Sequence, residues 1–275
     1  MTVATTWAPT PFPVEVHAER LARMRERCEQ RGLDGMLLMA QESLYYLLGY
    51  DQIGYWVFHA FWVPAGEGPV VAVCRAPDAD TIAQSPFVDD VQVWTDDQAD
   101  SPAVQVTAIL EGAGARRVGV ELTTHALVAT HWSALQEAAR GRVELVDASD
   151  LVPALRVVKD ELEIECFRRA AGHLERSYAA LEETLAPGVR ECDLLAASLD
   201  AMYRDGAGPT AIHPPIASGP RTMTQTHGSA TQREIREGEP VVAEIGAASA
   251  RYHAVAARSY VLGQPPAQLE RLHEA

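Results

Sequence analysis

Glu244 is the side chain of this sequence whose type and surroundings most directly suggest chemistry. It lies in the apolar run PVVAEIGA, where a carboxylate is costly to bury unless it is paired or used. Such a carboxylate could bind a cationic amidinium, attack an amidine carbon, or activate a water molecule that attacks it. The alternative is a residue on an edge strand whose side chain faces solvent.

His227 is the second candidate, and it lies directly before Gly228 in a loop rich in Gly, Ser and Thr. An unperturbed pKa of about 6.5 lets a histidine both take and give a proton near neutral pH. This residue type in a polar loop is therefore suited to general acid–base catalysis. The alternative is a histidine that is simply exposed on a loop.

His253 precedes the run of small residues AVAA. By the period of two along a strand, His253, Val255 and Ala257 share one face, while Tyr252 lies on the other. We expect Glu244 and the His253 face to line one cavity across a strand pair. A histidine buried in the core fits the pattern equally well.

Alternating strands and helices must position these side chains. Residues 15–31 predict a helix that Gly32 ends. Short apolar runs predict strands at 35–40, 55–64, 69–74, 91–94, 118–121 and 143–148, with helices near 102–113 and 127–140. This order predicts an α/β domain with a mixed or parallel sheet.

The boundary to a second domain falls near the segment 153–159. Two helices, at 159–187 and 191–207, precede a loop and the strand pair EPVVAEIG and RYHAVAARSYVLG. We therefore predict domains at residues 1–155 and 156–275. Neither an internal repeat nor a low-complexity tract occurs in the sequence.

Composition excludes several classes of function. The 275 residues carry a formal net charge of −15, which argues against binding nucleic acid or an anionic membrane, since both require a basic face. The four cysteines form no CxxC pair, so neither a zinc knuckle nor a disulfide framework is indicated. Without a signal peptide or a long apolar stretch, the expected location is the cytoplasm.

Four motifs, in order along nearly the whole chain, resemble the creatinase and aminopeptidase P family. LYYLLGYD is similar to a signature of the family's N-terminal domain, and VKDELEIECFRRAAG to the helix that opens its catalytic domain. LAPGVRECDL resembles a helix junction, and IASGPRTMTQTHG resembles the loop that leads to the active-site histidine. The resemblance implies a "pita-bread" catalytic domain in which His227 is catalytic.

The resemblance also bears on metal binding. Metal-dependent members carry two aspartates eleven residues apart on the strand pair; here Glu244 and Val255 hold those positions. Valine cannot bind a cation, and its presence removes a ligand from both metals. We therefore expect no metal and no cofactor. Transition-metal sites usually need three or more protein ligands.

Within the family, the sequence looks most similar to metal-independent C–N hydrolases such as ectoine hydrolase and creatinase. Tyr252, His253, Arg258 and the segment 262–266 look closest to ectoine hydrolase, and so does Glu244. The expected function is hydrolysis of a non-peptide C–N bond in a small cyclic amidine or guanidino acid. The alternatives are a metal-dependent Xaa-Pro peptidase, and a non-catalytic or truncated homologue that binds a small molecule or a partner subunit.

The resemblance implies that the substrate is contacted by His253, Tyr252, Arg258, Tyr55 and Trp56. Arg258 could anchor a carboxylate by a bidentate contact, although pairing with a structural acid fits slightly better. In this family the aromatic segment of the N-terminal domain reaches the partner's active site, so Tyr55 or Trp56 could cover a cationic substrate. The family's dimeric habit predicts a homodimer. We also expect only the first half of the catalytic domain within these residues.

Overall fold

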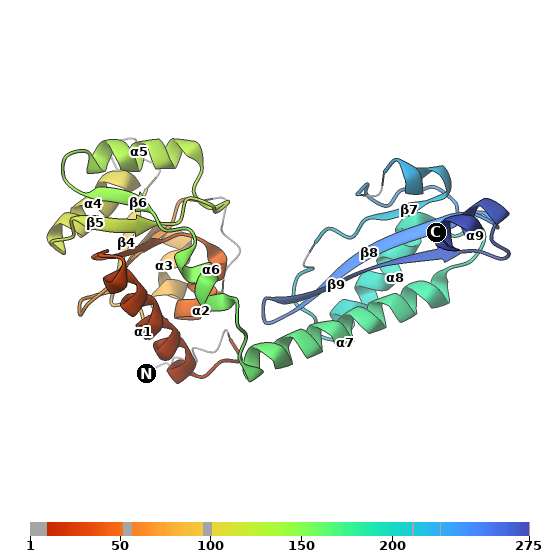
Figure 1. The fold of residues 1–275 in the computed structure, drawn as a ribbon, viewed down its shortest axis with the longest axis horizontal. Helices are drawn as coiled ribbons and strands as arrows, with labels where there is room; N and C mark the ends of the chain where they lie inside the picture. The colour runs from red at the N-terminus through yellow and green to blue at the C-terminus, as the bar shows by residue number, and fades with distance from the viewer. Residues whose placement is uncertain (1–9, 52–56, 96–100, 211, 226, 275) are drawn as a thin grey trace. The chain divides into compact units, whose positions relative to one another are not determined.

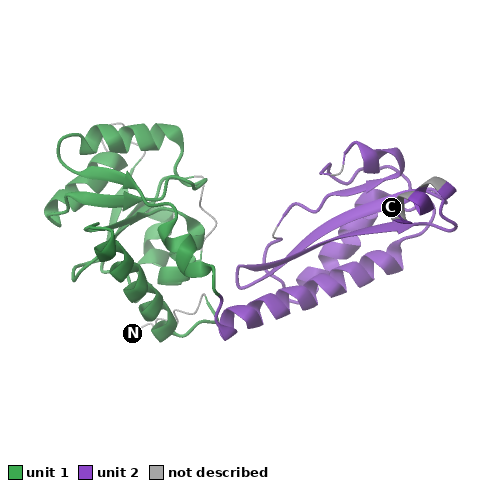
Figure 2. Ribbon diagram, viewed as in Figure 1, with its two compact units in different colours: residues 1–158 green, residues 159–275 purple. Residues whose placement is uncertain are grey.

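The computed structural model of the chain describes residues 10–51, 57–95, 101–210, 212–225 and 227–274. The chain divides into two compact units, Met1–Val158 and Lys159–Ala275 (Figure 2). The predicted domain boundary lies between residues 155 and 156, close to this division. No helix in the described ranges is both long and apolar enough to cross a membrane.

Unit 1 is built on a six-stranded sheet with the order β4-β3-β2-β1-β5-β6 (Figure 1). Strand β2 is antiparallel to both β1 and β3, whereas the β3–β4, β1–β5 and β5–β6 pairs are parallel. The predicted α/β class with a mixed sheet is confirmed. The strands are β1 Gly35–Leu38, β2 Ala60–Pro64, β3 Val71–Arg75, β4 Asp90–Trp94, β5 Arg117–Val120 and β6 Glu144–Asp147.

Helices cover both faces of this sheet, because its central strands are apolar on both sides. On β1, Met36 and Leu38 belong to one core cluster and Leu37 to the other. The first cluster includes residues of α1, α2, α3 and α6, and the second includes residues of α4 and α5. These helices are α1 Val14–Gln30, α2 Gln41–Leu48, α3 Ala76–Ile82, α4 Pro102–Gly112, α5 Ala129–Ala139 and α6 Leu151–Arg156.

The sequence did not predict α2, α3 or α6. In α2, residues 43–48 are all buried, so the segment lacks the apolar and polar faces by which an amphipathic helix is recognised. The other two helices are short, with seven and six residues. Strand β2 begins at Ala60, inside the predicted strand 55–64.

Unit 2 packs α7 Glu161–Thr184 and α8 Glu191–Arg204 against one face of a three-stranded antiparallel sheet, ordered β7-β8-β9. The strands are β7 Ile216–Ser218, β8 Pro240–Ser249 and β9 Tyr252–Val261; η1 Gly219–Met223 and α9 Ala267–Glu274 complete the unit. A capping box between Asp160 and Glu163 starts α7, which satisfies two backbone N–H groups of the helix end.

A two-residue turn joins the long strands β8 and β9, since Ser249 is the register partner of Tyr252. Both turn residues have positive φ angles, 49° at Ala250 and 64° at Arg251. Positive φ at both central positions is typical of the type I′ turn, whose twist matches that of a hairpin. The turn therefore fixes which residues of β8 and β9 lie opposite each other.

Candidate active site

Glu244 lies in the middle of β8, on the face of the sheet that points away from α7 and α8. Its neighbours Ala243 and Ile245 are fully buried in the helix-facing core, so strand alternation places Glu244 on the outer face. The register pairs Glu244 with Ala257. The carboxylate is 33% exposed and lies among small side chains that leave room around it.

His227 approaches this carboxylate from the loop that follows η1. Its Nε2 lies 4.0 Å from Oε2 of Glu244. This separation is too long for a direct hydrogen bond and leaves a place for a bridging water or a substrate group. The histidine side chain is 86% exposed. The structure thus brings together the two residues that the sequence proposed as catalytic.

His253 shares the outer face with Glu244. It pairs with Ala248 across the hairpin, and Val255 pairs with Gly246. His253 is exposed, so it does not occupy the core. The outer face therefore carries one carboxylate and one strand histidine, separated by Gly246 and apolar side chains.

Tyr252 points to the opposite face, toward α7. Its hydroxyl donates a hydrogen bond of 2.9 Å to Oε1 of Glu163, and its ring packs edge-on against Phe167 with the centroids 5.3 Å apart. The structure does not place this predicted substrate contact beside Glu244. Its contacts hold the turn end of the hairpin against the start of the helix.

Arg258 also lies on the helix-facing side. Its guanidinium donates to Glu182 at 3.0 Å and lies 4.3 Å from the centroid of the Tyr178 ring. The Tyr178 hydroxyl in turn lies 2.9 Å and 2.5 Å from the carbonyl oxygens of Ala243 and Ala256. These contacts correspond to the structural alternative, in which Arg258 pairs with an acid of α7.

The remaining predicted contacts, Tyr55 and Trp56, lie outside the described residues. The part of the same aromatic run that the structure does describe is buried within unit 1, with exposures of 1% for Phe58, 0% for Phe61 and 3% for Trp62. These three rings belong to the core of unit 1. The homodimer remains a prediction.

Glu191 holds both ends of the loop that carries His227, and the sequence did not single it out. Its side chain is fully buried. Oε1 accepts hydrogen bonds from the N–H and the hydroxyl of Ser218, at 2.8 and 2.7 Å. Oε2 accepts from the N–H and the hydroxyl of Thr231, at 3.0 and 2.7 Å, and from the Arg221 guanidinium.

The environment of Glu191 keeps its carboxylate charged. Burial by itself raises the pKa of Glu191, but the hydrogen bonds from Thr231, Ser218 and Arg221 outweigh burial, and the pKa is lowered. Arg221 also donates to the Ser229 carbonyl at 2.9 Å, inside the His227 loop. A signal existed in the sequence, because Glu191 falls on the buried stripe of α8 formed with Leu194, Ser198 and Met202.

The donor set on this face does not by itself fit a metal ion. Within the described parts of the chain, no group of three or more His, Cys, Asp or Glu side chains is arranged to hold one. Glu244 and His227 offer two ligands, and Val255 offers none. A structural or catalytic transition-metal site generally uses at least three protein ligands.

Two family domains match the chain. Residues 20–158 match the Creatinase/Prolidase N-terminal domain, and residues 165–275 match Metallopeptidase family M24. The chain therefore belongs to the family of creatinase, prolidase and aminopeptidase P, which confirms the resemblance seen in the sequence.

Named relatives include a probable dipeptidase and an ectoine hydrolase. The chain is 32% identical over 258 residues to "Probable dipeptidase PepE" of Mycobacterium tuberculosis, covering 92% of this chain and 66% of the relative. It is 26% identical over 284 residues to ectoine hydrolase of Halomonas elongata, covering 96% and 70%. The crystal structure of dipeptidase PepE from Mycobacterium ulcerans superposes with a TM-score of 0.79 at 26% identity, covering 96% and 69%.

The chain thus spans 66% of the length of the PepE relatives that it matches. Overall identity is higher to the dipeptidase than to ectoine hydrolase. The predicted similarity to ectoine hydrolase depends instead on a few residues of the strand pair and its end: Glu244, Tyr252, His253, Arg258 and the segment 262–266.

Proposed function

We propose that this protein hydrolyses a C–N bond of a small substrate on the outer face of the β8–β9 hairpin, without a metal ion. The observation that carries the proposal is the approach of His227 to within 4.0 Å of Glu244. A histidine and a carboxylate at this distance can share the two proton transfers that hydrolysis of a C–N bond requires.

In the proposed reaction, a water molecule adds to the carbon of an amidine or guanidinium group, and Glu244 takes the proton of that water. His227, in its charged form, then gives a proton to the leaving nitrogen as the C–N bond breaks. The half-buried carboxylate also attracts the positive charge of the substrate, which orients the carbon for attack. Glu244 acting as the nucleophile itself is a second route through the same two residues.

The proposed substrate is a small cyclic amidine or guanidino acid. Val255, opposite Gly246, gives the outer face an apolar wall where a metal ligand would otherwise stand. A carboxylate beside an apolar wall suits a planar cation better than a neutral peptide. The 26% identity to ectoine hydrolase agrees with this choice.

A metal-dependent Xaa-Pro dipeptidase is the second candidate. It is favoured by the 32% identity to PepE and by the match to Metallopeptidase family M24. In that case the metal ligands would have to include residues other than the pair formed by Glu244 and His227.

The test uses protein produced from the whole coding sequence. Elemental analysis measures bound metal, and hydrolysis is followed with ectoine, creatine and a series of Xaa-Pro dipeptides, each with and without a chelator. We expect turnover of an amidine or guanidino substrate that a chelator does not reduce. Dipeptide turnover that requires about two metal ions per chain would establish the second candidate instead.

Variants locate the reaction. His227→Ala and Glu244→Gln are each expected to lower turnover by about 10²–10⁴-fold, the usual effect of losing a general acid–base group, while the melting temperature stays close to that of the wild type. Glu175→Gln, at an exposed position of α7, is the matched control and should retain full turnover. Full turnover in both site variants would place the active site elsewhere.

A further inference from the structure

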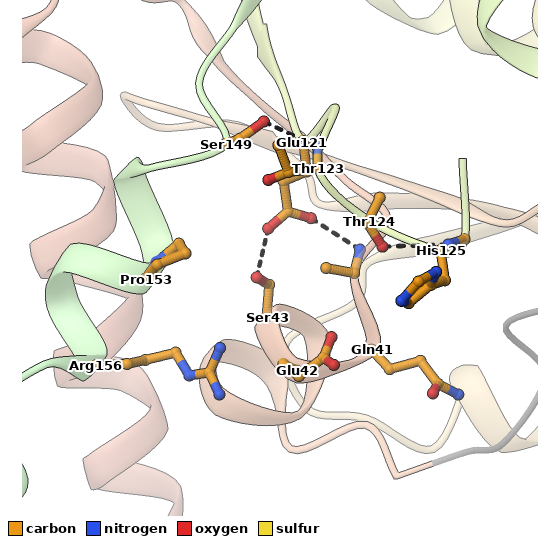
Figure 3. A pocket seen from close by; sticks show the side chains of 12 residues that line it. Gln41, Glu42, Ser43, Glu121, Thr123, Thr124, His125, Ser149, Pro153 and Arg156 are labelled. Carbon is orange, nitrogen blue, oxygen red and sulfur yellow. Dashed lines mark hydrogen bonds between the residues drawn. The ribbon is translucent and has the colours of Figure 1, made fainter. Parts of the chain in front are cut away.

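Unit 1 contains a cavity of about 860 Å³ that the proposed reaction does not use (Figure 3). We propose that this cavity binds a free amino acid or short peptide as a zwitterion, with Arg156 holding the carboxylate and Glu42 the ammonium group. Cavities of about 300–1,000 Å³ are typical of small-molecule sites. The inference concerns a different unit and does not depend on the proposed hydrolase activity.

The topology of the sheet places this cavity where α/β sheets bind ligands. It lies at the carboxyl ends of the parallel strands β1, β5 and β6, and its lining includes Ala40, Glu121 and Ser149, which follow those strands. After β1 the chain enters α2 on one face of the sheet, and after β5 it reaches α5 on the other. Ligands of open α/β sheets bind at such a switch point.

Glu121 fastens the floor of the cavity. Its side chain is only 4% exposed. Oε2 accepts hydrogen bonds from the N–H groups of Met39 and Ala40, at 2.9 and 2.8 Å, and Oε1 accepts from the Ser43 hydroxyl. The carboxylate thereby ties the end of β5 to the segment between β1 and α2. Its two oxygens are occupied, so Glu121 shapes the site rather than contacting ligand.

Ser149 fastens a second wall. Its hydroxyl oxygen accepts hydrogen bonds from the N–H groups of Leu122 and Thr123, at 2.8 and 3.1 Å. This ties the segment after β6 to the segment after β5. Because hydrogen bonds within the chain itself make these cross-connections, binding does not have to order three separate loops.

The charged groups at the cavity suggest what it holds. Arg156 is half-buried, and within the described part of the chain its guanidinium has no hydrogen-bond or ion-pair partner. It extends from α6 toward the start of α2, where Ser43 and Glu42 lie (Figure 3). A free guanidinium with its fork of N–H groups matches a carboxylate, which it binds by two parallel hydrogen bonds.

Glu42 supplies the opposite charge on a different element. It is exposed at the first turn of α2 and lines the same cavity. One cation and one exposed anion that line the same cavity favour a molecule that carries both charges. A phosphate dianion fits less well, because two carboxylates line the site and the chain carries a net charge of −15.

The experiment measures binding to the full chain by NMR, with backbone amides of Thr123, Thr124 and Ser149 as reporters of this cavity. The probes are leucine, leucylalanine, leucinamide, N-acetylleucine and inorganic phosphate. We expect leucine or leucylalanine to give saturable chemical-shift changes at these amides. Comparing these two probes distinguishes binding of a free amino acid from binding of a peptide. Leucinamide, which lacks the carboxylate, should bind at least about tenfold more weakly.

Arg156→Gln should weaken the binding at least about tenfold, whereas Arg116→Gln, at an exposed position of the same unit, should leave it unchanged. If Arg156→Gln does not fold, binding is measured instead with Arg156→Lys, which keeps the charge but not the fork of N–H groups. Equal binding of N-acetylleucine would overturn the contact with Glu42. Shifts with phosphate alone, no shift with any probe, or equal affinity in the Arg156 and Arg116 variants would overturn the proposal.

Discussion

Two buried carboxylates, Glu121 in unit 1 and Glu191 in unit 2, are satisfied by different sets of hydrogen-bond donors. Glu121 in unit 1 accepts from two backbone N–H groups and one hydroxyl. Glu191 in unit 2 accepts from two N–H groups, two hydroxyls and the guanidinium of Arg221. Each fastens segments that are distant in the sequence: the floor of a cavity in one unit and the His227 loop in the other.

The difference appears in the pKa values. Burial dominates at Glu121 and raises its pKa, although hydrogen bonds from Ser43, Ala40 and Met39 oppose the effect. At Glu191 burial acts in the same direction, but the larger set of donors lowers the pKa. The comparison teaches that burial raises the pKa of a carboxyl group in both units, and that the number and charge of its donors decide whether this effect is outweighed.

The largest expected effect on stability comes from removing Glu191, the carboxylate bound by Ser218, Thr231 and Arg221. Glu191→Ala leaves Arg221 without its carboxylate partner and removes the acceptor of four donors of Ser218 and Thr231. Breaking a buried ion pair typically lowers the free energy of unfolding by about 3–5 kcal/mol, and urea denaturation measures it. Asp200→Ala removes an exposed ion pair with Arg204 on the same helix and should change stability by less than about 1 kcal/mol. Equal effects would mean that the Glu191 network contributes little.

Glu121→Ala should have a smaller effect, because no cation is left behind. It leaves the N–H groups of Met39 and Ala40 without acceptors, which costs about 1–3 kcal/mol. Glu121→Gln should cost less, since an amide oxygen still accepts from both. Hydrogen exchange at peptides of unit 1 reports the change in local stability. A larger loss in Glu121→Gln than in Glu121→Ala would contradict this account.

Tyr252→Phe sharpens the comparison with a third buried carboxylate, Glu163. Phenylalanine keeps the packing against Phe167 but removes the hydrogen bond to Glu163, and the free energy of unfolding should fall by about 1 kcal/mol. If a substrate of the proposed reaction is found, its KM should stay unchanged, because Tyr252 lies on the helix-facing side. A raised KM with unchanged stability would instead support the substrate contact predicted from the sequence.

The smallest and most diagnostic difference is in the dependence of stability on pH. For Glu121 the folded pKa lies above the ordinary 4.5, so its contribution is present below that pH and is lost as pH rises through the folded value. For Glu191 the folded pKa lies below 4.5, so its contribution is present above that pH and is lost as pH falls through the folded value. Wild type should therefore lose stability relative to Glu121→Gln toward higher pH, and relative to Glu191→Gln toward lower pH. Denaturation of the three proteins across both windows checks the signs; slopes of the same sign would refute the comparison.

Sequence periodicity was sufficient to predict strands and their faces where side chains alternate regularly. The strand pair around Glu244 and the shared face of Glu244 and His253 followed from the period of two, and the motif before Gly228 located the loop of His227. The sequence favoured a structural acid as the partner of Arg258, but it identified neither Glu182 as that acid nor the pairing of Tyr252 with Glu163. Helix and strand residues that meet in space are far apart in the sequence.

The two carboxylate networks escaped the sequence for a related reason. Glu191 is the first residue of a helix, where an acidic side chain is ordinarily exposed and interacts with the helix dipole. Only its spacing with Leu194 and Ser198 indicated burial. Glu121 directly follows a short apolar strand. Its partners Met39 and Ser43 lie 82 and 78 residues earlier in the sequence, so no local pattern connects them.

The two-residue turn at Ala250 and Arg251 determines on which face of the sheet Glu244 lies. A chain that gained one residue there would keep two strands of the same composition, yet the pairing could slip and turn Glu244 inward, toward Tyr178, since a shift of one residue exchanges the two faces of a strand. The length of the turn thus sets the register of the hairpin. Both turn residues adopt a left-handed backbone that side chains other than glycine, asparagine and aspartate rarely favour, so an Asn-Gly turn would keep the same count with less strain.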